Sequence, residues 1–388
     1  MTSRGRPVVY LHVGEPKSGT TFLQDVMWGN RTVLARQGVQ LPGAEAADQL
    51  RAAQDLREVP QAPDDPSGSY DGEWDRLAKH ARRAAVAVIS HELLAAATEA
   101  QAARALGTLA GAEVHVVLTV RDFVSLLPAE WQETVKHRNS GTWQRWVRRV
   151  MRTENAERPA PWFWQVHDTL DVLRRWSQGL PPSQVHVVTV PPAGSPADLL
   201  WQRFASVIGV DAASVDLSAA RPNTSLGLAE AELLRRLNAA LGRDGVPDWY
   251  YAAHVKERIA HEILAARPAA LRPRLNAPQE QWARGRAEKV VAGLQESGYR
   301  IEGDLDDLVP APAGVRRGRP GKVPADAVLD AAVDVIAAVV RDDYRPAGAS
   351  GARSQVRGTA RVMRRARDLK AIAMRQLRML RWRWTERR

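Results

Sequence analysis

Four short apolar runs, rich in β-branched residues, constrain the fold of this 388-residue chain more than any other feature. They occupy residues 8–13, 85–90, 113–120 and 185–190, and each is nearly continuous in apolar residues instead of alternating with polar ones. Strands with this pattern are buried on both faces, as in parallel sheets covered by helices. We therefore predict a mainly parallel sheet.

Segments with the hydrophobic period of an α-helix lie between and after these runs. They span residues 20–37, 130–152, 165–177, 279–297 and 325–341. Parallel strands joined by helices form an open sheet with helices on both faces. The predicted fold class is therefore α/β, doubly wound, with flanking helices and a helical C-terminal extension. Ligands of such sheets bind at the carboxyl ends of the strands.

The positive charge of the chain is concentrated near its C-terminal end. Residues 345–388 contain 14 Lys and Arg residues and two acidic residues, a net charge of +12, so with +11 on the whole chain the other residues carry −1. A Pro-, Gly- and Arg-rich linker with a short helix, residues 311–344, separates this tail from the body, residues 1–310. Because the body is nearly neutral, we expect no specific nucleic acid as partner.

The basic tail has the pattern of an amphipathic helix over residues 356–386. Arginines flank an apolar stripe at helical spacing, which comprises Val362, Ala366, Leu369, Ala373, Leu377, Leu380 and Trp384. This pattern predicts binding to an anionic membrane surface. An oligomerisation or partner-binding helix and a solvated arm are the alternatives.

Cysteine use and the lack of long apolar runs bear on the compartment. The chain has no cysteine, which excludes disulfides and thiolate metal sites. It has no apolar run of about 18 residues that would span a membrane, and residues 1–7 are too short and polar for a signal peptide. We expect a cytoplasmic protein that the tail holds at the inner face of the membrane.

The sequence HVGEPKSGTTFLQ, residues 12–24, connects the first apolar run to the first helical segment. Gly14 and Gly19 have the spacing of the glycines in a Walker-type phosphate loop, but Thr20 follows Gly19 where that loop has its lysine. The lysine, Lys17, stands two positions before Gly19 instead. Only seven of the 55 basic residues are lysines, so each lysine is a candidate for a specific role.

The loop has the properties of an anion site. Gly19 allows a sharp turn, the backbone N–H groups of residues 18–21 can point into one concavity, and the following helix N-terminus adds its dipole. Lys17 adds a full charge and three hydrogen-bond donors. We therefore predict that the loop binds a phosphate or sulfate group.

The sequence PKSGTT, residues 16–21, resembles the 5′-phosphosulfate loop of the sulfotransferases that use 3′-phosphoadenosine 5′-phosphosulfate (PAPS). Further stretches resemble the actinobacterial branch of that superfamily: TVRDFVSLLPAEWQETVKHR, VHVVTVPPAGSPADLLWQRFASVIGVD, RPNTSLGLAEAELLRRLN and GYRIEGDLDDLVP. The resemblance covers most of residues 12–310. It implies a sulfotransferase domain over residues 1–310, with a fold like that of the P-loop NTPases, and sulfuryl transfer from PAPS to a hydroxyl, which we expect on a carbohydrate or glycolipid.

The resemblance also implies which residues hold PAPS. By this resemblance, five loop residues bind the 5′-phosphosulfate group: Lys17, Ser18, Gly19, Thr20 and Thr21. Arg121, directly after the third apolar run, matches the arginine that grips the 3′-phosphate, a contact that suits a planar guanidinium. The alternative for Arg121 is a surface Arg-Asp pair at a helix start.

Two other parts of the 3′-phosphate site are less clear from the sequence. The family usually has a serine eight residues after the arginine, but this chain has Ala129 there, and Ser125, one helical turn earlier, lies on the same face. A further basic residue normally closes the adenosine site from a later loop. Arg272 and Arg274 in ALRPRLNAP are the candidates, with a solvated loop as the alternative.

The base that takes the proton from the acceptor hydroxyl is expected just after the second apolar run. The sequence there is VISHELL, with His91 and Glu92 adjacent. Small-molecule sulfotransferases of the cytosol carry a histidine in a similar setting, whereas heparan and tyrosine sulfotransferases use a glutamate. We favour Glu92 and keep His91 as second choice, since either could act within hydrogen-bond reach. A helix-capping Glu92 and a packed His91 are the structural alternative.

The resemblance implies no metal, because in-line transfer needs positioning and charge stabilisation, here from Lys17 and the loop amides. Among the acids of GDLDDL, Asp304 is expected to cap a turn or helix. Two other functions stay open. One is an ATP-dependent P-loop phosphotransferase, and the other is a catalytically inactive membrane- or nucleic-acid-associated protein of the same fold, which the departure at Ala129 favours.

Tryptophan is unusually common, with 13 residues against four phenylalanines. Several cluster in GTWQRWVRR and APWFWQVHD. Tryptophan stacks well on sugar rings, so these residues could line an acceptor cleft. The alternative is that they pack in the core.

Overall fold

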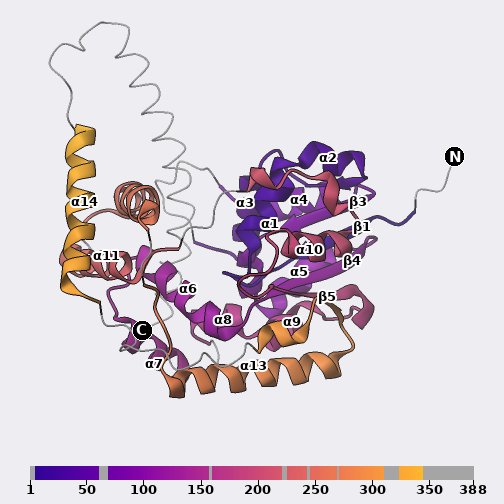
Figure 1. Ribbon diagram of the computed structural model, residues 1–388. Helices are drawn as coiled ribbons and strands as arrows, with labels where there is room; N and C mark the ends of the chain where they lie inside the picture. Colours follow the sequence, from indigo (N-terminus) through magenta and orange to yellow (C-terminus); the bar gives the residue numbers. More distant parts are fainter. Residues whose placement is uncertain are drawn as a thin grey trace, which may run out of the picture.

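The computed structural model describes residues 5–60, 69–156, 160–220, 225–242, 245–268, 271–309 and 323–343. Within them the chain forms a six-stranded parallel sheet flanked by helices (Figure 1), so the predicted α/β class and parallel sheet are confirmed. The predicted tail at residues 345–388, with its membrane-binding stripe, and residues 311–322 of the predicted linker lie outside the described residues.

The sheet has the order β2-β3-β1-β4-β5-β6, and every neighbouring pair is parallel. The strands are β1 (Val8–His12), β2 (Val39–Gln40), β3 (Val86–Ser90), β4 (Glu113–Val120), β5 (Val185–Thr189) and β6 (Arg300–Glu302). The four apolar runs predicted from the sequence are β1, β3, β4 and β5, each within one residue of its predicted ends. The edge strands β2 and β6 were not predicted, because two or three residues are too few to form an apolar run.

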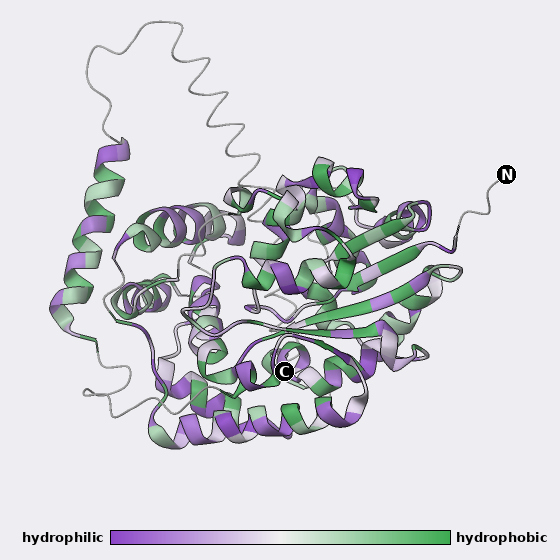
Figure 2. Cartoon of the chain, turned by 45° about the vertical axis from the view of Figure 1, so that its right-hand side comes forward, coloured by the Kyte–Doolittle hydropathy of each residue, from purple (hydrophilic) through white to green (hydrophobic). Residues whose placement is uncertain are grey.

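The central strands are apolar throughout because helices cover both faces of the sheet. Val88, Val117 and Val188 pack on one side, in the same buried cluster as residues of α1 (Thr20–Gly29) and α10 (Leu199–Ile208). The strand residues that alternate with them pack on the other side; they include Val9, Leu11, Ala87, Ile89, Val116 and Leu118. Figure 2 shows the strands as largely hydrophobic ribbons.

Strand β1 lies at the point where the direction of winding reverses. After β1 the chain builds β2 and β3 on one side of it, and then returns to place β4, β5 and β6 on the other side. In open parallel sheets, ligands bind at the carboxyl ends of the strands next to such a point. The loop at residues 12–24 leaves the carboxyl end of β1 there.

The helix predicted at residues 20–37 is two helices. α1 (Thr20–Gly29) ends at Asn30, and α2 (Arg31–Arg36) begins directly after it. The amide of Asn30 donates a hydrogen bond to the carbonyl oxygen of Asp216 at 2.8 Å. This long-range contact, which no local pattern shows, fixes the break.

The helix predicted at residues 130–152 begins earlier and is interrupted. α6 (Phe123–Lys136) starts directly after Asp122, whose carboxylate caps it, and α7 (Trp143–Arg152) is separate. Between them Arg138 has a φ of 64°, which an α-helix does not accommodate.

The helix predicted at residues 165–177 is likewise divided, into α8 (Trp162–His167) and α9 (Thr169–Trp176). Asp168 leaves the helical conformation with a ψ of 85°, and its carboxylate caps α9 by accepting from the N–H of Asp171.

The remaining elements complete the covering layers. The longer helices are α3 (Ala46–Leu56), α4 (Glu73–Ala81), α5 (Glu99–Thr108), α10 (Leu199–Ile208), α11 (Leu228–Leu241), the π-helix η5 (Tyr251–Ile263), α13 (Ala277–Ser297) and α14 (Ala325–Asp343). The short ones are η1 (Glu92–Ala96), η2 (Pro182–Gln184), η3 (Ala212–Ser214), η4 (Leu217–Ala219), α12 (Asp248–Tyr250), η6 (Leu264–Ala266) and η7 (Leu305–Leu308). Asp304 caps η7, as predicted.

The helices α11, η5 and α14 form a second layer away from the sheet, on the left of Figure 1. The predicted helix at residues 325–341 is α14, and it packs on α11 and η5 through a face that includes the buried Val328 and Ala331. It therefore belongs to the folded body. None of the helices in the described part of the chain combines the length and the apolar composition that a membrane span requires.

The tryptophans of the two predicted clusters lie in the core or pack against it. Trp143 and Trp164 are 3% and 2% exposed, Trp143 stacks on Trp146, and Trp164 meets Phe163 and Trp282 edge to face. Of the two alternatives for this cluster, the structure therefore shows packing between α7, α8 and α13.

Candidate functional site

The loop between β1 and α1 has a constrained backbone. Gly14 and Gly19 have positive φ values of 30° and 85°, and a Cβ atom on Gly14 would lie 2.5 Å from the Thr20 methyl group. Lys17 also has a positive φ, 63°, which costs a residue with a side chain about 1–3 kcal/mol. Strain of this kind persists where the surroundings hold it and is concentrated at functional sites.

Hydrogen bonds from β4 hold the loop in this shape. The hydroxyl of Ser18 lies 2.6 Å from that of Thr119 and 2.5 Å from the carbonyl oxygen of Glu15. The N–H of Ser18 also donates to Glu15, and the N–H of Glu15 donates to the carbonyl of Thr119. Ser18 is fully buried, and its N–H is already bonded within the loop. The prediction that this N–H is one of the anion-binding donors is therefore wrong, and Ser18 shapes the loop instead.

The N-terminus of α1 is open to an anion. Its N-cap is Gly19, no side chain of the described residues caps it, and its first turn holds no acidic residue. The first N–H groups of a helix have no partner within the helix, so those of Thr20 and Thr21 remain as donors. Thr20 is buried and Thr21 exposed.

The structure brings together residues from the ends of three neighbouring strands. The guanidinium of Arg121, after β4, donates to the carbonyl oxygen of Lys17 at 3.3 Å. The N–H of His91, after β3, donates to the carbonyl of His12 at 3.2 Å. Ser125 lies in the first turn of α6 and donates its N–H to the capping carboxylate of Asp122.

Arg121 is partly buried. Burial lowers its pKa, Asp122 opposes that shift, and Arg272 adds to it. Arg272 therefore lies within electrostatic range of Arg121, although it is more than 100 positions away in the sequence. Arg272 and Arg274, the two candidates for this part of the site, are both exposed, and the carbonyl oxygen of Arg274 accepts from the indole of Trp143.

The two candidate bases differ in orientation. His91 caps η1, and its Nδ1 accepts from the N–H of Leu93 at 3.1 Å. The carboxylate of Glu92 accepts from the amide of Gln24, on α1, at 3.2 Å. Burial raises the pKa of Glu92, but the charges of His91 and Lys17 and the hydrogen bonds from the Glu92 N–H and Gln24 together outweigh burial and lower it. Glu92 is thus an ionised group beside the loop, whereas His91 turns one ring nitrogen to its own helix.

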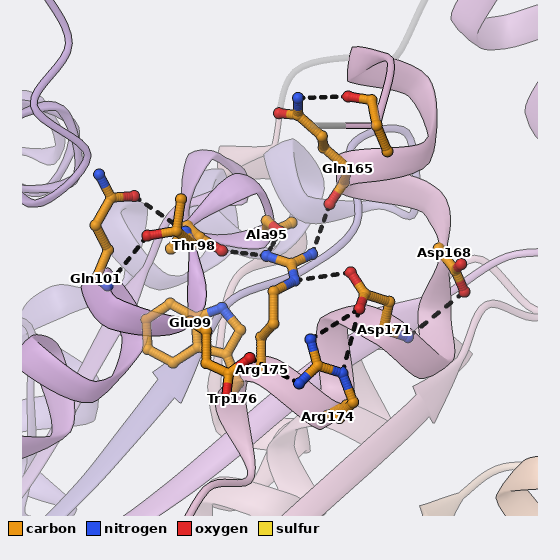
Figure 3. Close-up of polar contacts among 12 residues, drawn as sticks. Ala95, Thr98, Glu99, Gln101, Gln165, Asp168, Asp171, Arg174, Arg175 and Trp176 are labelled. Atoms are coloured by element: carbon orange, nitrogen blue, oxygen red, sulfur yellow. Dashed lines mark hydrogen bonds and ion pairs between the residues drawn. The ribbon is translucent and has the colours of Figure 1, made fainter. Parts of the chain in front are cut away.

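Helix α9 fixes the segment that carries these two residues (Figure 3). The buried guanidinium of Arg175 donates to the carbonyl oxygens of Ala95 and Ala97, to that of Gln165 at 2.7 Å, and to the carboxylate of Asp171 at 2.9 Å. The indole of Trp176 donates to Leu94 at 3.0 Å. Because these bonds hold the carbonyls of η1, they position the β3 end of the site.

A carboxylate that the sequence did not single out lies against the loop lysine. The Nζ of Lys17 is 2.6 Å from Oε2 of Glu133 on α6, and the same carboxylate is 2.9 Å from His137, 3.7 Å from Lys136 and 3.6 Å from Lys256. The lysines hold the pKa of Glu133 well below its usual value, against the effect of burial. The rarity of lysine was the one available signal, since three of seven lysines meet here.

A second buried charge network lies behind the loop. The imidazole of His167 is fully buried, with Glu15 of the loop 3.7 Å from Nδ1 and Glu130 of α6 3.8 Å from Nε2. Thr169 donates to the other oxygen of Glu15 at 2.5 Å. Burial lowers the pKa of His167, but the two carboxylates outweigh burial and raise it above 6.5.

Comparison of the chain with protein-family models, with curated proteins and with solved structures finds no match. Within the described residues, no group of three His, Asp or Glu side chains is placed to hold a metal ion.

We expect Arg175→Met to lower the free energy of unfolding by about 3–5 kcal/mol, because it leaves a buried carboxylate and several carbonyls without their partner. The change would appear in urea denaturation as a lower midpoint at an unchanged slope. Arg174→Met is the matched control. Arg174 is 52% exposed and pairs with Glu99 and Asp171, so its loss should cost at most about 1 kcal/mol. Equal losses in the two variants would contradict the anchoring role.

His167 should make stability depend on pH. Since its folded pKa is raised, its stabilising contribution is complete below the unfolded value of 6.5 and is lost as pH rises through the folded pKa. In that window one proton contributes a slope of about 1.4 kcal/mol per pH unit. Urea denaturation from about pH 6 to about pH 9 should show this decline in the wild type and in His80→Gln, an exposed control on α4. The decline should be absent in His167→Gln, and an identical profile there would rule the network out.

Proposed function

We propose that the chain is a sulfotransferase that moves the sulfuryl group of PAPS to a hydroxyl acceptor. The observation that carries the proposal is the convergence of Lys17, Glu92 and Arg121 at the ends of β1, β3 and β4, where the sheet changes its direction of winding. A cation beside an open helix N-terminus, a second cation and an ionised carboxylate are the groups required for transfer from a donor that carries two anionic groups, a phosphosulfate and a 3′-phosphate.

The residues at the loop suit the donor. Lys17 and the N–H groups of Gly19, Thr20 and Thr21 would hold the 5′-phosphosulfate, and Ser18 would maintain the loop. Arg121 would hold the 3′-phosphate, and the proximity of Arg272 supports it as the second cation there. Ser125, on the first turn of α6, would donate to the same phosphate in place of the serine that Ala129 replaces.

The chemistry assigned to the protein is one proton transfer and charge stabilisation. PAPS supplies the sulfuryl group and leaves as adenosine 3′,5′-bisphosphate. Glu92 would accept the proton of the acceptor hydroxyl while the hydroxyl oxygen forms its bond to sulfur. Lys17 would neutralise the negative charge that develops on the 5′-phosphate of the donor as the bond between sulfur and the bridging oxygen breaks. His91 stays the second choice as base.

The acceptor that we propose is a carbohydrate or a glycolipid. The basic segment at residues 356–386 supports a glycolipid met at an anionic membrane surface, on its sequence pattern alone.

Titration calorimetry with adenosine 3′,5′-bisphosphate tests the cofactor site. We expect about micromolar affinity in the wild type and a loss of about 10- to 100-fold in Lys17→Ala and in Arg121→Ala, because each removes charge-assisted hydrogen bonds to phosphate. Lys79→Ala and Arg148→Ala, at exposed positions of α4 and α7, should bind like the wild type. A preference for ATP with magnesium would favour a phosphotransferase instead.

Replacement of each candidate base identifies the one that acts. With radiolabelled PAPS and a panel of saccharide and glycolipid acceptors, Glu92→Gln should lower kcat by about 10²- to 10⁴-fold, because the hydroxyl proton has no acceptor. Its affinity for the bisphosphate should stay unchanged. His91→Asn should lose less, and the reverse order of losses would make His91 the base.

A further inference from the structure

Three ammonium groups from distant parts of the chain share the carboxylate of Glu133. Lys17 comes from the loop after β1, Lys136 from the last turn of α6, and Lys256 from the middle of η5. Their Nζ atoms lie 2.6, 3.7 and 3.6 Å from the Glu133 oxygens. We call these four residues, with His137, the lysine cluster. π-Helical turns such as those of η5 are rare and occur often at functional sites.

The lysine cluster is buried at one end and reachable at the other. The side chain of Lys256 is 2% exposed and that of Lys136 is 10%, while Glu133 is 19% and Lys17 about 30% exposed. The ammonium of Lys256 also contacts Nε2 of His137 at 2.9 Å. Buried ammonium groups are costly unless anions balance them.

One carboxylate lies within ion-pair distance of all three ammonium groups. Glu133 is the only acid within 4 Å of the three ammonium groups among the ion pairs of the described residues. Glu257 acts on the same lysines at longer range: burial and the charge of Glu133 raise its pKa, and the charges of Lys256 and Lys136 partly oppose that rise. Burial and the lysines lower the pKa of His261 to about 4, so it adds no positive charge near neutral pH.

The lysine cluster adjoins the reacting group of the proposed reaction. Lys17 and Lys136 both approach Oε2 of Glu133, so their nitrogens lie at most 6.3 Å apart, the sum of the two distances. When the phosphosulfate of PAPS pairs with Lys17, Lys136 and Lys256 are left with the single carboxylate of Glu133. An anionic group bound by Lys136 and Lys256 would then lie close to the sulfur atom that is transferred.

We propose that Lys136 and Lys256 form a subsite for an anionic group of the acceptor, next to the hydroxyl that is sulfated. The acceptor class is a hydroxyl compound that carries a sulfate, phosphate or carboxylate, such as a uronate or a sugar sulfate or phosphate. The assignment to the acceptor rests on the proposed sulfotransferase function. Glu133 occupies the lysines when no such group is bound.

Inorganic sulfate is the probe for this subsite. The protein is first saturated with adenosine 3′,5′-bisphosphate, so that the loop is filled, and sulfate is then titrated by calorimetry at constant ionic strength. We expect saturable binding that weakens at least about tenfold in Lys256→Met and in Lys136→Met, since each loses a charge-assisted contact. Lys79→Met is the matched control and should bind like the wild type.

Glu133→Gln supplies a test of opposite sign. Because it removes the carboxylate that competes for the lysines, it should bind sulfate more tightly than the wild type. This variant and the two lysine variants must also give the cooperative urea transition of the wild type. Sulfate binding that is equal in the wild type, Lys256→Met, Lys136→Met and Glu133→Gln would overturn the subsite.

The two proposals fail separately. If the bisphosphate does not bind, the sulfotransferase proposal fails, and the sulfate titration is run on the ligand-free protein. If sulfate binding to the ligand-free protein weakens in Lys256→Met and Lys136→Met, the anion subsite stands without its assignment to the acceptor. If sulfate binding is the same in these variants as in the wild type, the subsite is rejected together with the sulfotransferase proposal. If the bisphosphate binds but sulfate then does not, only the subsite is rejected. With an active preparation, glucuronate should show a lower KM than glucose in the wild type but not in Lys256→Met.

Discussion

The pairing of β1 between β3 and β4 is the constraint on which the rest of the structure depends. β1 is hydrogen-bonded on both sides and covered on both faces. The position and direction of its carboxyl end are therefore fixed, and so is the starting point of the loop that follows it. The ends of β3 and β4 then lie beside that loop, and Thr119 and the Arg121 side chain bond to it directly. The candidate site is therefore a consequence of strand order, and strained residues such as Lys17 are tolerated because the sheet holds both ends of the loop.

Buried charge surrounds this loop on two sides. In one network, His167 lies between Glu15 of the loop and Glu130 of α6. In the other, Glu133 of α6 pairs with Lys17 of the loop and with Lys256 of η5. Desolvation offsets much of the attraction between the charges of such networks, but removal of one partner leaves a buried charge unpaired, so each network holds its residues in this arrangement. Helix α6 takes part in both networks, so the second helical layer is coupled to the loop by electrostatics as well as by packing.

Much of the fold could be predicted from the sequence, because burial on both faces gives β1, β3, β4 and β5 an apolar run that is visible locally. The helix breaks could not. Asn30 ends α1 through a contact with Asp216, 186 positions away, and Arg138 ends α6 by a backbone conformation that periodicity does not reveal. The edge strands β2 and β6 form because they pair with neighbouring strands. A sequence of two or three residues does not predict such pairing.

By itself, the sequence determined the parallel α/β class, the loop with Gly14, Lys17 and Gly19, and the placement of Glu92 and Arg121 at strand ends, because each follows from local pattern and the geometry of a parallel sheet. Only the tertiary structure decided that Glu133 meets Lys17 from 116 positions away, that Lys256 contacts His137 from 119 positions away, and that Arg272 lies near Arg121. The reason is physical. Electrostatic and hydrogen-bonding partners act through space, and their separation is set by the packing of whole helices, which no stretch of sequence contains.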